Sequence, residues 1–401
     1  MTTIRLSEVP IGPLLAEGGE GRVHEVPGRA GVVYKAYRRP VAAGPLDALV
    51  RWPTEALAGR PDMGERVARA TAWPTGVVVD ERQPSRAAGV LMPRAPRRFS
   101  VRHRDGRSRL ASLSYLTADP ARRQAAYGVP LPPSATAERF GLVYALARIL
   151  EAFESGAERI VHGDLSAKNV LWSLQRGPEL FLIDCDNGER FDVTGRLLGD
   201  SERRRAMTPN WDDPQITTGA NPGPASDRYA LALIFLRVVG AAHFPIQKRQ
   251  KQGELLTIDV SLPATHGRPP GLRADAPVWE ACGRGLSLHD PEGRPAATAW
   301  VAVLAQILDD LGASDVRAAV EANQTSLAPA RPRVPARPRL STPPAGASAP
   351  RGSEVTVRPV PSAARSRQWQ VALPALAPVG TAARPVRALV AGGFGGAGAA
   401  S

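Results

Sequence analysis

The sequence predicts an α+β fold in two lobes, a small antiparallel sheet followed by a larger, mainly helical lobe. Between residues 10 and 94, short apolar segments such as GRVHEV and GVVYKAY alternate with glycine and proline turns. This pattern is typical of strands and predicts five of them, with one helix near Met63 to Ala72. After residue 134 the apolar residues recur at helical spacing, most clearly from Ala135 to Gly156. We therefore expect the two kinds of element to separate along the chain.

The same patterns set the expected boundaries. The small lobe spans residues 10–94, and the large lobe spans residues 134–312. Between them, residues 95–133 are rich in arginine and end in the turn PLPPS, which predicts an insertion at the hinge. The segment from Asp227 to Val239 is apolar nearly all round, as expected for a helix at the centre of the large lobe.

The C-terminal segment from residue 328 to 401 has a different composition. It holds ten arginines, no lysine and one glutamate, a net charge of +9, which leaves +4 of the total +13 for the rest of the chain. Its many prolines and few large apolar residues predict a disordered tail. Aromatic residues are not interleaved with its arginines, so we expect no specific nucleic-acid site there. A solvated basic tail of this kind could instead meet acidic partners.

Cysteine content and hydropathy bear on the compartment. The chain has two cysteines, Cys185 and Cys282, too few for a disulfide framework. The start MTTIRLSEVP lacks a basic stretch followed by an apolar one, and no apolar run reaches the ~18 residues that span a bilayer. We expect a cytoplasmic protein without a membrane span.

Two polar motifs near the middle of the chain carry candidate chemistry. The motif HGDLSAKN places Asp164 five residues before Asn169, and the apolar run FLI leads into Asp184. A carboxylate can orient the proton of an attacking hydroxyl, while a carboxylate and an amide oxygen can ligate the Mg²⁺ that neutralises phosphate charge. Asp184 at the end of a buried strand would be costly without a cation. The set predicts Asp164 as catalytic base, with Asn169 and Asp184 as metal ligands.

With these motifs the sequence resembles the protein kinase superfamily over roughly residues 10 to 312, and within it a divergent bacterial group of Ser/Thr-kinase-like proteins. The catalytic loop HRDxxxxN of the family is represented by His162, Gly163, Asp164 and Asn169. The metal-binding DFG is represented by Asp184, Cys185 and Asp186. The resemblance implies a bilobal protein-kinase-like fold and the cofactors ATP and Mg²⁺.

The small lobe contains the segments that the resemblance assigns to nucleotide binding. Ala16, Gly18 and Gly21, with Gly19 extra, stand where the family has its glycine-rich loop. Val23 takes the place of the aliphatic residue on the adenine, and Lys35 that of the lysine that holds the α and β phosphates. The family also pairs this lysine with a helix glutamate. Glu55 and Glu65 are the candidates, and the spacing of Glu65 before Pro74 favours it.

The large lobe has further matches and some departures. SDRYALALIF resembles the central helix of the family, with its buried Asp227, and DPEGRP resembles the late loop that supplies a structural arginine, Arg294. Gln215 stands where a glutamate usually pairs with that arginine, which predicts a hydrogen bond in place of an ion pair. Ser166 replaces the usual catalytic-loop lysine, and nearby Lys168 could reach the γ-phosphate in its stead.

The function that the resemblance implies is ATP-dependent transfer of a phosphoryl group, with the Ser or Thr hydroxyls of a protein substrate as acceptors. Two alternatives remain open. One is a pseudokinase or nucleotide-binding scaffold, although Lys35, Asp164, Asn169 and Asp184 are all retained. The other is a small-molecule kinase of the aminoglycoside-phosphotransferase type, which shares the HGDxxxxN motif but not the SDRYALA and DPEGRP segments.

Overall fold

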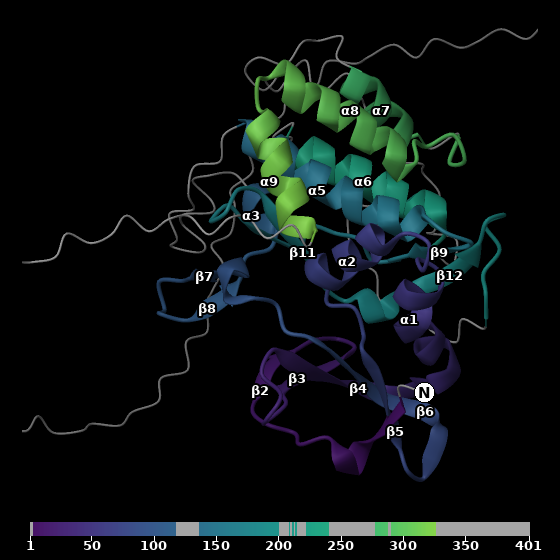
Figure 1. The fold of residues 1–401 in the computed structure, drawn as a ribbon. Coiled ribbons are helices and arrows are strands. Elements are labelled where there is room, and N and C mark those ends of the chain that lie inside the picture. Colours follow the sequence, from purple (N-terminus) through teal and green to yellow (C-terminus); the bar gives the residue numbers. More distant parts are fainter. Residues whose placement is uncertain are drawn as a thin grey trace, which may run out of the picture. The chain divides into compact units, whose positions relative to one another are not determined.

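The computed structural model has an α+β fold (Figure 1). It describes residues 3–117, 136–199, 222–239, 277–287 and 290–325, together with Thr208, Trp211, Asp213 and Pro214. The chain divides into two units, Met1–Pro335 and Ala336–Ser401, and every described residue belongs to the first. The predicted disordered tail, residues 328–401, lies outside the described residues.

The N-terminal third folds into one mixed sheet of six strands in the order β1-β5-β6-β4-β3-β2. The prediction of five antiparallel strands is wrong in one respect. An additional strand of three residues, β1, pairs parallel with β5, while the other neighbours are antiparallel. Its sequence TIR is too short to show an alternating pattern, so only pairing with β5 reveals it. The strand bounds are β1 Thr3–Arg5, β2 Leu14–Glu17, β3 Gly21–Glu25, β4 Val32–Ala42, β5 Gly76–Asp80 and β6 Gln83–Pro93.

Both faces of the sheet are covered near β5, which explains its continuous apolar run. Val77 and Val79 belong to the main core, whereas Val78 between them packs in a smaller cluster with Tyr34 and Leu91. Successive side chains of a strand point to opposite faces, so a strand buried on both faces needs apolar residues throughout.

Two helices follow β4 where one was predicted. They are α1, Ala43–Glu55, and α2, Pro61–Ala70. The prolines of α1 hide it from sequence inspection. Pro45 lies in the first turn, where no intrahelical N–H bond is needed. Pro53 lies near the end and cannot donate to Leu49 O, and that carbonyl accepts the indole N–H of Trp73 at 3.0 Å instead. Tertiary packing therefore satisfies the group that Pro53 leaves open.

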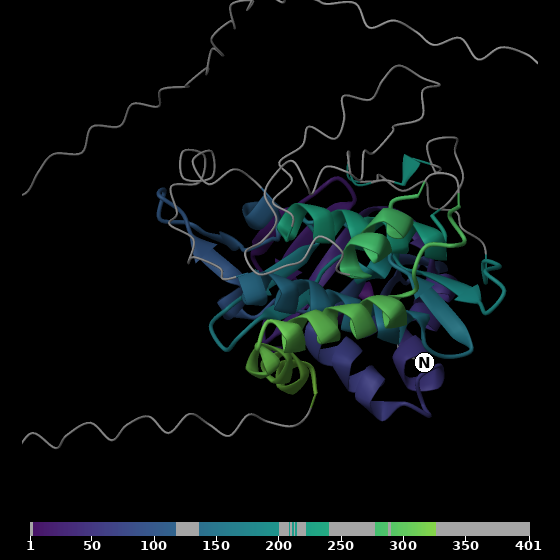
Figure 2. The same cartoon turned by 90° about the horizontal axis from the view of Figure 1, so that it is seen from above.

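The C-terminal half is mainly helical. In Figures 1 and 2, α5 lies at the centre of this part, and it packs against α2, α6, α8 and α9. The bounds are α5 Thr136–Glu154, α6 Pro224–Val238, α7 Pro277–Gly285, α8 Ala297–Asp310 and α9 Ser314–Gln324. The helix α9 continues the ordered structure beyond the predicted boundary at residue 312. It is held by Glu321, which accepts hydrogen bonds from Tyr144 on α5, at 2.6 Å, and from the buried Arg66 on α2.

Short strand pairs place the loops between these helices. Strand β9, Glu158–Val161, pairs with β12, Glu189–Asp192, and β10, Val170–Ser173, pairs with β11, Glu179–Leu182. The connection from β9 to β10 carries the motif HGDLSAKN, and the connection from β11 to β12 carries the motif DCDN.

The described part of the predicted hinge insertion packs on the pair β10 and β11. It contains η2, Arg97–Phe99, the hairpin of β7, Ser100–Arg102, and β8, Ser108–Leu110, and the short helix α3, Ser114–Thr117. Phe99 stacks on Phe181 with ring centroids 5.6 Å apart, and Leu113 N donates to Val170 O at 2.7 Å. Residues 118–135, which include most of the predicted remainder, lie outside the described residues.

The apolar helix α6 is buried among α3, α5, α7 and β9, as its sequence predicts. In the parts of the chain that the structure describes, no helix combines the length and hydropathy needed to cross a membrane.

An aromatic cluster links the helices next to the sheet with the helical half. Trp52 on α1, Trp73 and Phe153 on α5 have ring centroids 5.3 to 6.0 Å apart.

We expect Phe153→Ala to lower the free energy of unfolding by about 3–5 kcal/mol, because the substitution leaves a cavity beside the two tryptophan rings. Urea unfolding followed by tryptophan fluorescence measures this. Leu110→Ala, which removes an exposed side chain on β8, should change stability by less than about 0.5 kcal/mol.

Candidate active site

The loop between β9 and β10, which contains HGDLSAKN, is held from below by a buried aspartate of α6. Both carboxylate oxygens of Asp227 accept backbone N–H groups, from His162 at 2.6 Å and from Gly163 at 3.1 Å. His162 is fully buried, and its Nε2 donates to Ile183 O at 2.9 Å. Gly163 adopts φ +78°, a conformation that glycine reaches without strain. His162 thus serves as a structural residue beneath the loop.

Asp164 and Asn169 lie together, as their spacing predicts. Asn169 Nδ2 donates to Asp164 Oδ2 at 3.0 Å and to the carbonyl of Asp164 at 2.8 Å. Thr208 donates to the same carboxylate, from its N–H to Oδ1 at 2.7 Å and from its hydroxyl to Oδ2 at 3.2 Å. The carbonyl of Asn169 accepts from Ile183 N at 2.8 Å, so the loop is tied to the end of β11. The side chain of Asp164 can therefore accept an aliphatic hydroxyl.

Asp184 stands two residues after β11 in a strained conformation. Among the residues that the structure describes, it is the only non-glycine residue with positive φ, at 58°. A single residue in this region costs about 1–3 kcal/mol, and such residues cluster at functional sites. Its side chain is 40% exposed and its Oδ1 lies 3.1 Å from Lys35 Nζ. The conformation turns the carboxylate toward the open side of the site.

Lys35 on β4 is the buried cation of the site. Its side chain is 6% exposed and its Nζ lies 2.8 Å from Asp186 Oδ1, while Tyr37 OH donates to Asp186 Oδ2 at 2.9 Å. Burial acts to lower the pKa of Lys35, but the carboxylates of Asp186 and Asp184 outweigh it and raise that pKa well above its ordinary value. The ammonium group therefore stays protonated at neutral pH.

Asp186 is the residue of the site to which sequence reasoning gave no role. The motif DCDN offered a signal, because a second carboxylate directly after a buried strand also needs a cationic partner. Cys185 between the two aspartates is buried, which raises the pKa of its thiol well above the ordinary value, as do the charges of Asp186 and Asp184. It acts as a packing residue.

The glutamate predicted to pair with Lys35 is replaced by one from the glycine turn. Among the described residues the ion-pair partners of Lys35 are Asp186, Asp184 and Glu20, the last at 3.5 Å. Glu65 lies on α2, which packs against α5, α9 and β11 and not on β4, so the predicted pair is not formed. Glu55, the other candidate, ends α1 and pairs with Arg51 at 2.7 Å.

The turn between β2 and β3 contains the predicted glycine-rich loop. A Cβ on Gly21 would lie 2.2 Å from Ala36 O, so strand pairing with β4 requires glycine there. Gly18 and Gly19 have no atom within 4 Å of a Cβ position, while the N–H of Gly18 donates to Gly21 O at 2.9 Å and its carbonyl accepts from Arg38 Nε at 3.1 Å. Val23, on β3, packs partly buried against the main core.

Glu20 at the tip of this turn reaches into the site. Its Oε2 accepts from Asn187 Nδ2 at 2.7 Å and is 3.5 Å from Lys35 Nζ. The turn is thereby tied to the segment after β11 through a side chain that is itself 35% exposed. The glycine turn, β4 and the DCDN segment thus converge on one point.

Lys168 is exposed on the loop that holds Asp164, and it makes no ion pair with any residue that the structure describes. Ser166 is buried, and its hydroxyl donates to Thr208 Oγ1 at 3.4 Å. The structure thus leaves Lys168 free to turn toward an incoming anion, and its catalytic role stays a prediction.

Arg294 forms a buried ion pair with a residue to which the sequence gave no role. Gln215 lies outside the described residues, but Asp213, two positions earlier, pairs with Arg294 through both carboxylate oxygens. Arg294 also donates to the carbonyls of Ser287 and Ala225 at 2.8 and 2.9 Å. The guanidinium group is fully used, and Asp213, which it holds, lines a small pocket together with Asp164.

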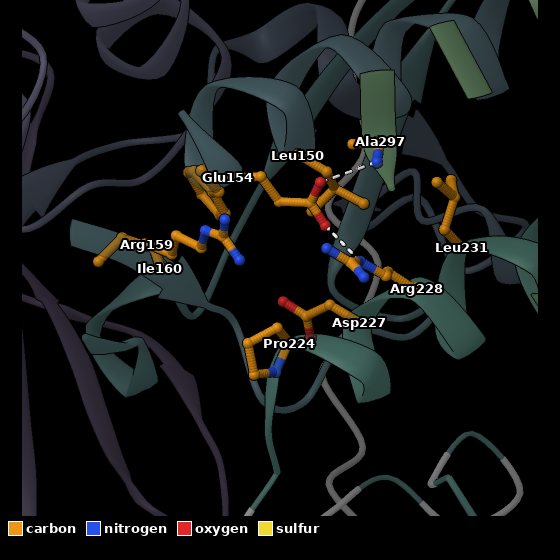
Figure 3. A pocket seen from close by; sticks show the side chains of 10 residues that line it. Leu150, Glu154, Arg159, Ile160, Pro224, Asp227, Arg228, Leu231 and Ala297 are labelled. Atoms are coloured by element: carbon orange, nitrogen blue, oxygen red, sulfur yellow. Dashed lines mark hydrogen bonds and ion pairs between the residues drawn. The ribbon is translucent and has the colours of Figure 1, made fainter. Parts of the chain in front are cut away.

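A pocket behind the loop lies among α5, β9, α6 and the start of α8 (Figure 3). At its centre the carboxylate of Glu154 accepts from Arg228 Nε at 2.7 Å and from Ala297 N at 2.9 Å. The guanidinium group of Arg159 also faces the pocket, opposite Asp227 (Figure 3). Asp227 uses both of its carboxylate oxygens to hold the loop. The pocket therefore lies among residues that support the loop from behind.

The donor atoms of the site suit a hard divalent cation. The described residues contain no cluster of three or more His, Cys, Asp or Glu side chains arranged to hold a metal. Mg²⁺ does not need one, because it is commonly held by one or two protein oxygens together with phosphate and water. Asp184 offers a carboxylate oxygen without a hydrogen-bond donor among the described residues, and Asn169 can offer an amide oxygen. Around Lys35 three carboxylates face one ammonium group, so the site has an excess of negative charge that a cation would balance.

Comparison with known proteins gives no assignment. No model of a known protein family matches the sequence. No curated protein matches it either.

The contacts of Glu20 predict how the glycine turn is restrained. We expect Glu20→Gln to speed amide hydrogen exchange at Gly18, Gly19 and Gly21, because a charge-assisted bond to Asn187 becomes a weaker neutral one. Exchange measured by mass spectrometry at neutral pH tests this.

Glu25→Gln is the matched control for Glu20→Gln. It removes the same charge from the neighbouring strand, where Glu25 pairs with exposed Arg94, and should leave exchange in the turn unchanged. Equal exchange in wild-type protein and Glu20→Gln would contradict the restraint.

Proposed function

We propose that this protein is an ATP-dependent phosphotransferase with a bilobal, protein-kinase-like fold, and that it phosphorylates Ser or Thr hydroxyls of a protein substrate. The observation that carries the proposal is the position of Lys35. Its buried ammonium group lies 3.1 Å from Asp184, which is 149 positions away in the sequence. A protonated lysine beside a partly exposed carboxylate can hold a nucleoside triphosphate together with Mg²⁺.

Each polar residue has a distinct share in this reaction. Asp164 orients the acceptor hydroxyl and takes its proton, a role supported by the hydroxyl of Thr208 that already donates to Asp164 Oδ2. Lys35 binds phosphate oxygens of the nucleotide. Asp184 and Asn169 would hold Mg²⁺, which neutralises charge on the phosphates when it is bound. Lys168 would turn toward the γ-phosphate.

The glycine turn supports the nucleotide-binding part of the proposal. The absence of side chains at Gly18 and Gly19 leaves room for phosphates beside the turn, and Val23 offers an aliphatic surface for the base. Glu20 occupies the space beside Lys35 by hydrogen bonding to Asn187, so a triphosphate would displace its carboxylate from the ammonium group. This exchange replaces one anionic partner of Lys35 with another.

The acceptor would enter beside Asp164. A protein side chain that enters from the surface would place its hydroxyl at Asp164. The cysteines are free and buried, which suits a reducing compartment such as the cytoplasm. The basic tail would serve encounters with acidic partners.

The roles predict separable effects of two substitutions. Asp184→Asn should nearly abolish phosphoryl transfer and weaken Mg²⁺-dependent nucleotide binding, because it removes a charged ligand. Asp164→Asn should spare nucleotide binding and slow transfer by roughly 10²–10⁴-fold, the usual share of a general base. Incubation with Mg²⁺ and labelled ATP, with a mixed protein substrate and mass spectrometry of the chain itself, measures transfer. Calorimetric titration with ATP measures binding.

Asp105→Asn, on the exposed hairpin of β7 and β8, is the matched control and should change neither quantity. Nucleotide binding without transfer by the wild-type protein would favour the scaffold function. Transfer to small molecules alone would favour the aminoglycoside-kinase type of activity. Full transfer by Asp164→Asn, with chemistry rate-limiting, would show that Asp164 is not the base.

A further inference from the structure

Lys35 has three carboxylate partners, and they differ in how permanent they are. The side chain of Asp186 is 0% exposed, whereas those of Asp184 and Glu20 are 40% and 35% exposed. Asp184 is the proposed ligand of a cation, and Glu20 lies on an open glycine turn. Both would exchange partners when a nucleotide binds. Only Asp186 is placed to hold Lys35 before and after binding.

We propose that Asp186, oriented by Tyr37, is the positioning residue of Lys35 and does the work for which a helix glutamate was expected. The purpose of this positioning rests on the proposed function, because a fixed Lys35 is useful for holding phosphates. The evidence for it is the geometry alone.

Both oxygens of Asp186 are used by β4. Oδ1 accepts from Lys35 Nζ at 2.8 Å and Oδ2 accepts from Tyr37 OH at 2.9 Å. Lys35 and Tyr37 are two positions apart in one strand, so their side chains leave the same face. A carboxylate with two charge-assisted bonds to one rigid strand has no freedom to turn. The strand and Asp186 therefore fix each other.

The backbone after β11 separates the two aspartates. Asp184 takes its left-handed conformation at the start of the 3-10 turn η3, Cys185–Asn187. This places the side chain of Asp184 on the open side and that of Asp186 on the buried side. Cys185 between them packs into the core, with its thiol 3.6 Å from Leu182 O. One short turn thus supplies both an exchangeable and a permanent carboxylate.

A consequence is that the position of Lys35 does not depend on a helix. Helix α1 lies on β5 and β6, and α2 packs against α5 and α9, yet neither provides a partner for Lys35 among its described contacts. Movement of these helices would leave the ion pair of Lys35 and Asp186 in place. The lysine is held by the segment that follows β11.

The first test measures how firmly the Lys35 ammonium group is held, and it requires no enzymatic activity. A buried, ion-paired ammonium group exchanges its protons slowly and gives a resolved ¹⁵N signal. We expect the Lys35 signal in the wild-type protein, its loss in Asp186→Asn, its weakening in Tyr37→Phe and its retention in Asp184→Asn. Thermal unfolding shows whether each variant is folded, and Tyr37→Phe keeps every charge and so tests the pair even where Asp186→Asn does not fold.

The second test measures nucleotide affinity in the presence of EDTA and in the presence of Mg²⁺. We expect Asp186→Asn to weaken binding of a fluorescent ATP analogue by about tenfold under both conditions, because a misplaced Lys35 loses its phosphate contact. Tyr37→Phe should act in the same direction to a smaller extent. Asp184→Asn should weaken binding only in Mg²⁺, and Asp105→Asn should have no effect.

The outcomes separate the two proposals. A Lys35 signal that survives in both Asp186→Asn and Tyr37→Phe, or a loss of nucleotide binding in Glu65→Gln that Asp186→Asn does not share, would overturn the positioning role of Asp186. Failure of the wild-type protein to bind any nucleotide would reject the proposed function, while the ammonium signal would still decide the role of Asp186.

Discussion

The buried ion pair between Lys35 and Asp186 is the constraint on which the arrangement of the site depends. It joins residues 151 positions apart, one in a strand of the sheet and one in the segment after β11. Taking two charges out of water costs several kcal/mol for each ion, and the cost is recovered only if the geometry is good and further hydrogen bonds are made. Tyr37 supplies such a bond. The sheet and the helical half must therefore pack closely at this point, and backbone bonds such as Ala72 N to Leu182 O, at 2.7 Å, hold them there.

Two other buried acids fix the loop opposite Lys35 by the same physical rule. Asp227 satisfies two backbone N–H groups of the loop, and Asp213 neutralises Arg294. In each case the buried charge has hydrogen-bond partners for its polar atoms. Leaving such a charge unpaired would be costly, so alternative local conformations are disfavoured. The carboxylates of Asp184 and Glu20 are only partly buried. Burial thus divides the acids of the site into those enclosed by the protein and those that solvent can reach.

The sequence predicted those parts of the fold whose signal is local. Glycine turns, apolar strands and the apolar helix α6 were recognisable because each carries its own pattern. The strand β1 and the helix α1 were not, because pairing with β5 stabilises the first and a tertiary acceptor compensates for Pro53 in the second. For the site, the spacing of Asp164 and Asn169 predicted their contact. The partners of Lys35 could not be predicted, since several glutamates and aspartates had suitable chemistry and only the packing of α2 away from β4 excludes Glu65.

The departures from the expected motifs have a common form, in which a charge is kept at its place while a different residue supplies it. Arg294 meets Asp213 although residue 215 is a glutamine, and Lys35 meets Asp186 and Glu20 although no helix glutamate reaches it. Electrostatic compensation requires a charge at a point in space and is indifferent to the chain position that provides it. The balance of these two buried cations therefore does not require a carboxylate at one fixed position of the chain.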